Sequence, residues 1–119
     1  MLNEQKQYSP EKLKDFKSII DKEISIVEKE LKKFEEDQET QKEKRANSNV
    51  DFNQSSRHFQ QQAKNKEIMN RLQQRLKELQ SALLRIENKT YGVCERTGEL
   101  IREERLKAKP TARYDIAQN

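Results

Sequence analysis

Very few residues in this chain combine a reactive side chain with a neighbour that would activate it. The 119 residues include one cysteine, Cys94, and one histidine, His58. A single cysteine excludes an internal disulfide, and Glu95 beside it would not lower the pKa of its thiol, which favours a buried structural thiol over a redox sensor. No nucleophile lies next to a base, and no glycine-rich phosphate loop is present. The sequence therefore argues against an enzyme.

A polar segment from residue 47 to residue 56, rich in Asn and Ser, supplies the next candidates. Asp51 is a lone carboxylate that cannot hold a metal ion without ligands from a partner, and it also suits a turn. Phe52 is an aromatic residue in a polar loop, where it would either brace the loop or anchor a contact. Arg57 could contact an acidic partner, and His58 lies among glutamines as a solvated position.

The segment before this loop is predicted to be a helix from about residue 10 to residue 46. Ser9 is a good N-cap, Pro10 suits the first helical position and Glu11 places an acid in the first turn. The apolar residues then recur at steps of three and four, which is the spacing of a heptad seam. They are Leu13, Phe16, Ile20, Ile24, Val27, Leu31 and Phe34.

A second helix is predicted from about residue 57 to residue 89, and its seam is more regular. The steps alternate strictly between three and four along Met69, Leu72, Leu76, Leu79, Leu83 and Ile86. Two such seams joined by the loop at 47–56 predict an antiparallel coiled-coil hairpin over residues 1–89.

The register of that hairpin predicts where its stability lies. If the chain turns near Asp51, paired residues have numbers that sum to about 102, so Leu31 faces Leu72. Towards the loop, both seams become polar together, through Gln38, Gln41, Asn65, Gln62 and His58. The half of the hairpin near the tip is therefore expected to be the less stable half.

Composition supports an elongated helical protein rather than a large globule. Only 31% of the residues are hydrophobic and 39% are charged. Such values also occur in disordered chains, but the two periodic seams argue against disorder. The 25 basic and 21 acidic residues are interspersed, which gives no basis for sequence-specific DNA binding. We expect a cytoplasmic protein, since no apolar segment could form a signal peptide or cross a membrane.

The C-terminal segment, residues 90–119, carries a recognisable pattern of residues. Its members are Tyr91-Gly92, Cys94, Gly98, Ile101, Arg105-Leu106, Ala108, Pro110 and Ala112. In these residues the chain resembles the TraR/DksA family of RNA polymerase-binding regulators, which carry a C4-type zinc-finger knob. The likeness is close in this last third, and the hairpin matches in architecture.

The resemblance also implies where a metal would bind. The four zinc-ligating cysteines of the family correspond to Cys94, Thr97, Asp115 and Gln118. One thiolate of four remains, so we expect neither zinc nor another cofactor. Packing would then replace the metal, with candidate core residues Tyr91, Val93, Leu100, Ile101, Leu106, Ala108, Tyr114 and Ile116.

The resemblance implies a non-enzymatic transcription regulator whose hairpin tip enters the secondary channel of RNA polymerase. The family's tip motif falls on Asp51, Gln54 and Ser56, which join Phe52 and Arg57 as expected partner-binding residues. We expect a monomer. The alternative is a coiled-coil adaptor or a self-associating structural protein with no polymerase role.

Overall fold

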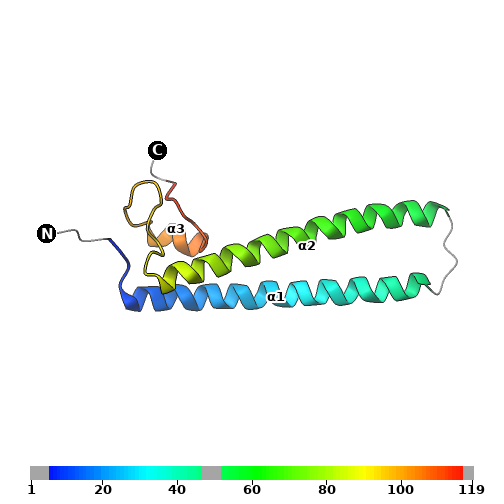
Figure 1. Cartoon of the computed structure of the whole chain (residues 1–119), viewed down its shortest axis with the longest axis horizontal. Coiled ribbons are helices and arrows are strands. Elements are labelled where there is room, and N and C mark those ends of the chain that lie inside the picture. The colour runs from blue at the N-terminus through cyan, green and yellow to red at the C-terminus, as the bar shows by residue number, and fades with distance from the viewer. Residues whose placement is uncertain (1–5, 47–51, 117–119) are drawn as a thin grey trace. The chain divides into compact units, whose positions relative to one another are not determined.

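The computed structural model describes residues 6–46 and 52–116, with side chains over 6–44 and 57–116. Three helices follow one another along the chain: α1 (Pro10–Ala46), α2 (Phe52–Glu87) and α3 (Glu103–Ala108) (Figure 1). The long helices α1 and α2 pack as a hairpin. The described residues form no strand, although Val93 and Leu100 make one isolated antiparallel bridge. The predicted all-α hairpin is therefore confirmed.

The start of α1 follows the predicted capping chemistry. Ser9 precedes the helix, and its side-chain oxygen accepts a hydrogen bond from the backbone N–H of Lys12 at 3.2 Å. Its carbonyl oxygen accepts another from the N–H of Leu13 at 2.9 Å. Pro10 occupies the first helical position, where its missing N–H leaves no hydrogen bond unmade.

The second helix begins at Phe52, earlier than the predicted residue 57, and ends at Glu87. Residues 52–56 are therefore helical in backbone rather than part of the loop. Asn and Ser favour helix starts as well as turns, so their abundance could not locate this boundary. In the described part of the chain, no helix is long and apolar enough to cross a membrane.

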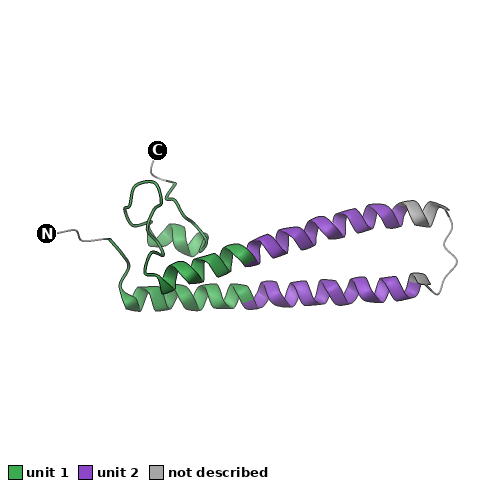
Figure 2. Ribbon diagram, in the orientation of Figure 1, with its two compact units in different colours: residues 1–24, 77–119 green, residues 25–76 purple. Residues whose placement is uncertain are grey.

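The chain divides into two compact units, coloured separately in Figure 2. The first contains residues 1–24 and 77–119, and the second contains residues 25–76. The first unit thus joins the opening turns of α1, the last turns of α2 and the C-terminal segment. The predicted division at residue 89, which separated the helices from that segment, stays a prediction.

Nearly all of the buried apolar surface belongs to the first unit. Its side chains with at most 6% exposure are Leu13, Phe16, Ile20, Leu79, Ala82, Tyr91, Cys94, Ile101, Leu106 and Ala112. Among the described residues of the second unit, Val27 is the one apolar side chain buried to this degree, at 4% exposure. The core therefore lies at the base of the hairpin, where the C-terminal segment packs.

That C-terminal segment is held to α1 by aromatic contacts. The ring of Phe16 lies 5.3 Å from that of Tyr91 and 5.3 Å from that of Tyr8. Gly92 has a φ of +79°, and a Cβ there would lie 2.6 Å from the Tyr8 ring. Glycine at this position therefore serves both the backbone turn and the close approach of Tyr8.

Three of the residues expected in the core of the C-terminal segment lie at its surface instead. Tyr114 is 41% exposed, Ile116 is 63% exposed, and Ala108 is also exposed. The expectation of a core at these three positions is therefore wrong. A guanidinium, that of Arg96, lies 4.8 Å above the Tyr114 ring.

A pair of leucine substitutions on α2 tests the location of the core. Leu79 is fully buried, whereas Leu84 on the same helix is 59% exposed. Leu79→Ala is expected to lower the free energy of unfolding by about 2–5 kcal/mol, because it leaves a cavity. Leu84→Ala is expected to change it by no more than about 0.5 kcal/mol. Urea unfolding followed by circular dichroism measures both, and equal losses would contradict this core.

Candidate functional site

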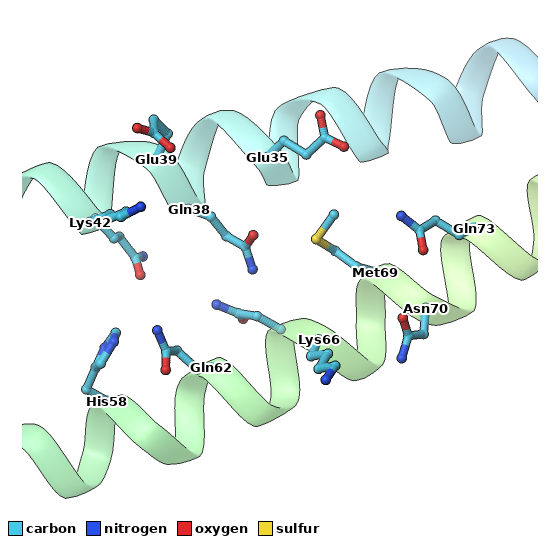
Figure 3. Close-up of a pocket in the computed structure, with 12 residues that line it drawn as sticks. Glu35, Gln38, Glu39, Lys42, His58, Gln62, Lys66, Met69, Asn70 and Gln73 are labelled. Atoms are coloured by element: carbon cyan, nitrogen blue, oxygen red, sulfur yellow. The ribbon is translucent and has the colours of Figure 1, made fainter.

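The polar part of the hairpin seam lines a cavity between α1 and α2 in the second unit. The cavity has a volume of about 640 Å³. All five polar residues predicted for this seam line it, namely Gln38, Gln41, His58, Gln62 and Asn65. Figure 3 shows the labelled Gln38, His58 and Gln62 pointing into the space between the two helices, and Met69 also projects into that space.

The lining of this cavity is suited to water and polar groups rather than to apolar packing. Side-chain amides supply both donors and acceptors, while Lys42 and Glu39 add charge at the edge. The Nε2 atom of His58 is buried and has no hydrogen-bond partner among the described residues. Because little apolar surface is buried here, this half of the hairpin is expected to open more readily than the base.

The residues expected at the tip lie mostly outside the part of the chain whose side chains are described. Asp51 lies outside the described residues altogether. Phe52, Gln54 and Ser56 belong to the first turns of α2 by backbone alone. Arg57 is described and its side chain is exposed. The structure thus leaves the proposed contacts of the tip as a prediction.

Sequence reasoning missed one exposed aromatic residue close to these positions. Phe59 on α2 is 72% exposed, which is unusual for an aromatic side chain. The sequence contained a signal of this exposure. Phe59 directly follows His58, which belongs to the seam, and a residue one position away from a helical seam points away from the partner helix.

Three of the four positions that correspond to zinc ligands come together in the first unit. The thiol of Cys94 is 1% exposed and accepts hydrogen bonds from the Thr97 side chain and from the backbone of Asp115, Thr97 and Arg96. Gln118, the fourth position, lies outside the described residues. The fold therefore brings Cys94, Thr97 and Asp115 into contact with one another through these hydrogen bonds.

These hydrogen bonds also change the acidity of the thiol. Burial raises the pKa of Cys94, but the hydrogen bonds outweigh burial and bring the pKa to about 7. Glu95, the neighbour in sequence, is not a cause of this shift. The lowered pKa was not foreseen, because the donors that produce it are brought close by the fold.

The buried Asp115 carboxylate in this cluster also makes an ion pair. It is 3% exposed and pairs with the guanidinium of Arg102 at 3.0 Å. Its Oδ2 accepts hydrogen bonds from the backbone N–H of Arg102 at 3.0 Å and from Nε at 3.1 Å. The interaction therefore connects Arg102, directly before α3, with Asp115 near the end of the described residues. The hydrogen bond with Asp115 also raises the pKa of Arg102.

The residues at these positions do not fit a structural zinc ion. Such sites take four cysteine or histidine ligands in a tetrahedron, and a threonine hydroxyl is a poor substitute. The carboxylate of Asp115 already accepts hydrogen bonds from Arg102 through both oxygens. In the described ranges, no three His, Cys, Asp or Glu side chains gather closely enough to hold a metal ion.

This arrangement predicts that the protein needs no metal to fold. Protein purified without a chelator is expected to contain well below one zinc ion per chain, because one thiolate of four remains. Its thermal unfolding is expected to be the same with and without EDTA. Elemental analysis and a melting curve test this, and stoichiometric zinc that EDTA removes with loss of structure would disprove it.

A second prediction concerns the ion pair that holds the C-terminal segment. Asp115→Asn is expected to lower the free energy of unfolding by about 1–3 kcal/mol, since it weakens charged hydrogen bonds at a buried carboxylate. The matched control is Glu95→Gln. It weakens a pair with Arg113 in which both side chains are more than 40% exposed, and should cost no more than about 0.5 kcal/mol.

All three tyrosines, Tyr8, Tyr91 and Tyr114, belong to the first unit, which contains the Arg102–Asp115 ion pair. Tyrosine fluorescence during urea unfolding would therefore follow the unfolding of that unit. Equal stability of the Asp115→Asn protein and the parent would show that the ion pair does not hold this segment.

Comparison with known proteins gives matches to the C-terminal segment and to the fold. Residues 89–114 match the family described as prokaryotic dksA/traR C4-type zinc finger. Over 39 residues the chain is 56% identical to an uncharacterized protein of Aquifex aeolicus (strain VF5). This aligned stretch covers 33% of this chain and 27% of that protein. Over 41 residues it is 49% identical to general stress protein 16O of Bacillus subtilis (strain 168), covering 34% and 25%. The matches thus span about a quarter of the length of these curated relatives.

The solved structure of transcription factor DksA2 from Pseudomonas aeruginosa has the same fold. The TM-score is 0.77 at 22% sequence identity, and the superposition covers 88% of this chain and 78% of that one. The similarity of fold therefore includes the hairpin, whereas the zinc-finger family match covers residues 89–114. Residues 89–114 thus match the dksA/traR C4-type zinc-finger family, and the chain as a whole has the fold of that solved structure.

Proposed function

We propose that this protein is a transcription regulator that binds RNA polymerase and inserts its hairpin tip into the secondary channel, the pore through which nucleotides reach the active site. The observation that carries the proposal is the hairpin of a TraR/DksA protein with an apolar base and a polar seam towards the tip. The protein would act by its position in the channel, without catalysing a reaction.

The change of seam chemistry supports insertion rather than a purely structural role. A coiled-coil adaptor gains stability from apolar residues along its whole seam. Here the seam changes from buried Leu79 and Val27 to the amides of Gln38 and Gln62. A polar seam loses little stability when water surrounds it, because its side-chain amides can form hydrogen bonds with that water. A channel that admits nucleotides is such an environment. The adaptor alternative is therefore less well supported.

The proposed contacts are those of the tip: Asp51, Phe52, Gln54, Ser56 and Arg57. Asp51 contributes a negative charge and Arg57 a positive one, so they suit polar groups inside a partner rather than a metal ion. Phe59 joins this set on the strength of its 72% exposure, because exposed aromatic residues are frequent anchors of protein interfaces. A cytoplasmic monomer is part of the same proposal.

The tip is predicted to be needed for regulation and dispensable for folding. Asp51→Ala combined with Phe52→Ala is expected to change the free energy of unfolding by no more than about 0.5 kcal/mol, because neither residue belongs to the apolar seam. In transcription with the cognate polymerase, this variant should lose most of its effect on initiation. The control is Lys29→Ala with Glu30→Ala, two exposed positions on α1 away from the tip, and it should regulate like the parent.

Two outcomes would contradict the proposal at different levels. If tagged parent protein from its own host brings down no polymerase subunits under stringent washing, the polymerase-binding function is wrong and the adaptor alternative is favoured. If polymerase binds, but the folded tip variant still regulates like the parent, the insertion mechanism is wrong although the partner is right.

A further inference from the structure

A groove at the base of the hairpin lies apart from the tip and from the Cys94 cluster. It belongs entirely to the first unit and has a volume of about 490 Å³. Its apolar surface comes from Tyr8, Pro10, Leu13 and Ile86. Three lysines complete the lining, Lys14 and Lys17 from α1 and Lys89 from just beyond the end of α2. No aspartate or glutamate lines this groove.

The wall made by Tyr8 is fixed in place by other contacts. Its hydroxyl donates a hydrogen bond to the carbonyl oxygen of Ile101, and its ring packs edge-on against Phe16. The groove is therefore a built feature of the folded base. A concave apolar surface of this size accommodates a few residues of a peptide or a small ligand.

The charges at the groove are largely uncompensated. Lys17 pairs with Asp21 at 2.9 Å, whereas Lys14 and Lys89 make no ion pair within the described part of the chain. Both side chains are exposed at the edge of an apolar surface. The groove thus attracts negative charge and, at its centre, an apolar side chain.

Lys89 gives an independent reason to regard the groove as functional. Its φ is +63°, a left-handed conformation that glycine adopts without strain and that lysine adopts at a cost. The position follows the end of α2, and its N–H donates to the Ile86 carbonyl oxygen at 3.1 Å. Glycine is the usual residue after a helix end of this kind. A lysine held there against its backbone preference points to a role for its side chain.

We propose that this groove docks a short acidic segment of a partner protein, with one large apolar side chain of that segment on Pro10 and Ile86 and its carboxylates beside Lys14 and Lys89. An anionic membrane is a poorer match, because lipid surfaces are contacted by convex apolar faces and this surface is concave. The proposal does not depend on which partner receives the hairpin tip.

The probe is a short synthetic peptide in which two leucines are flanked on both sides by aspartate and glutamate. Titration into ¹⁵N-labelled full-length protein, followed by NMR, is expected to give saturable shifts at Leu13, Lys14, Ile86 and Lys89. Lys14→Glu with Lys89→Glu should weaken binding by about tenfold, because two attractions become two repulsions. The matched control is Lys22→Glu with Lys77→Glu, which reverses two exposed lysines outside the groove and should bind within about twofold of the parent.

The variant Lys89→Gly separates binding from folding. It removes the backbone strain, so its melting temperature should equal or exceed that of the parent, while peptide binding should weaken severalfold. A merely structural Lys89 would leave binding unchanged. A peptide with serines in place of the leucines should bind more weakly than the parent peptide.

Several results would overturn the proposal. One is the absence of saturable shifts in the groove, and another is an equal loss of binding in the control variant. Binding to phosphatidylserine vesicles but not to the peptide would assign the groove to a lipid surface instead. A concentration-dependent dimer that Lys14→Glu with Lys89→Glu dissociates, measured by analytical ultracentrifugation, would assign it to a second copy of this chain.

Discussion

The burial of Tyr91 is the interaction on which the base of the molecule depends. Its side chain is fully inaccessible, its ring lies 5.3 Å from that of Phe16 on α1, and its hydroxyl donates to the Pro110 carbonyl oxygen at 2.7 Å. One residue thus joins the first helix, the end of the second and the return of the C-terminal segment. Burial raises the pKa of its hydroxyl far above the usual range, so the hydroxyl remains a donor at any physiological pH.

The rest of the molecule follows from how little apolar surface is available beyond this point. With 31% hydrophobic residues, the chain cannot bury a core along the whole hairpin. Apolar packing is concentrated at the base, and the seam of the second unit is lined by amides around a cavity. The apolar packing of the first unit and the amide-lined seam of the second are therefore expected to differ in local stability.

Without a fitting set of zinc ligands, the C-terminal segment needs other connections. The Arg102–Asp115 ion pair, with its atoms 3.0 Å apart, connects two parts of the segment. The residues before α1 add a second connection, because Tyr8 packs beside Gly92 and Lys6 pairs with Glu99. A metal ion binds its ligands at one point, whereas these contacts are distributed, so loss of any one is expected to weaken the segment without unfolding it. Cys94 lies among these contacts, and hydrogen bonds from Thr97, Asp115 and Arg96 lower the pKa of its thiol.

Heptad spacing and capping residues alone determined the two long helices, their antiparallel seam and the five polar residues that line its cavity, because these features depend on local periodicity. The same local information placed the start of α1 at Pro10 correctly and the start of α2 too late, since Asn and Ser suit both loops and helix starts. Tertiary structure alone decided that Tyr114 and Ile116 are exposed, that Arg102 meets Asp115, and that Lys14 and Lys89 share one groove. Each of these depends on which distant segments approach one another, and no periodicity within a single helix specifies that approach.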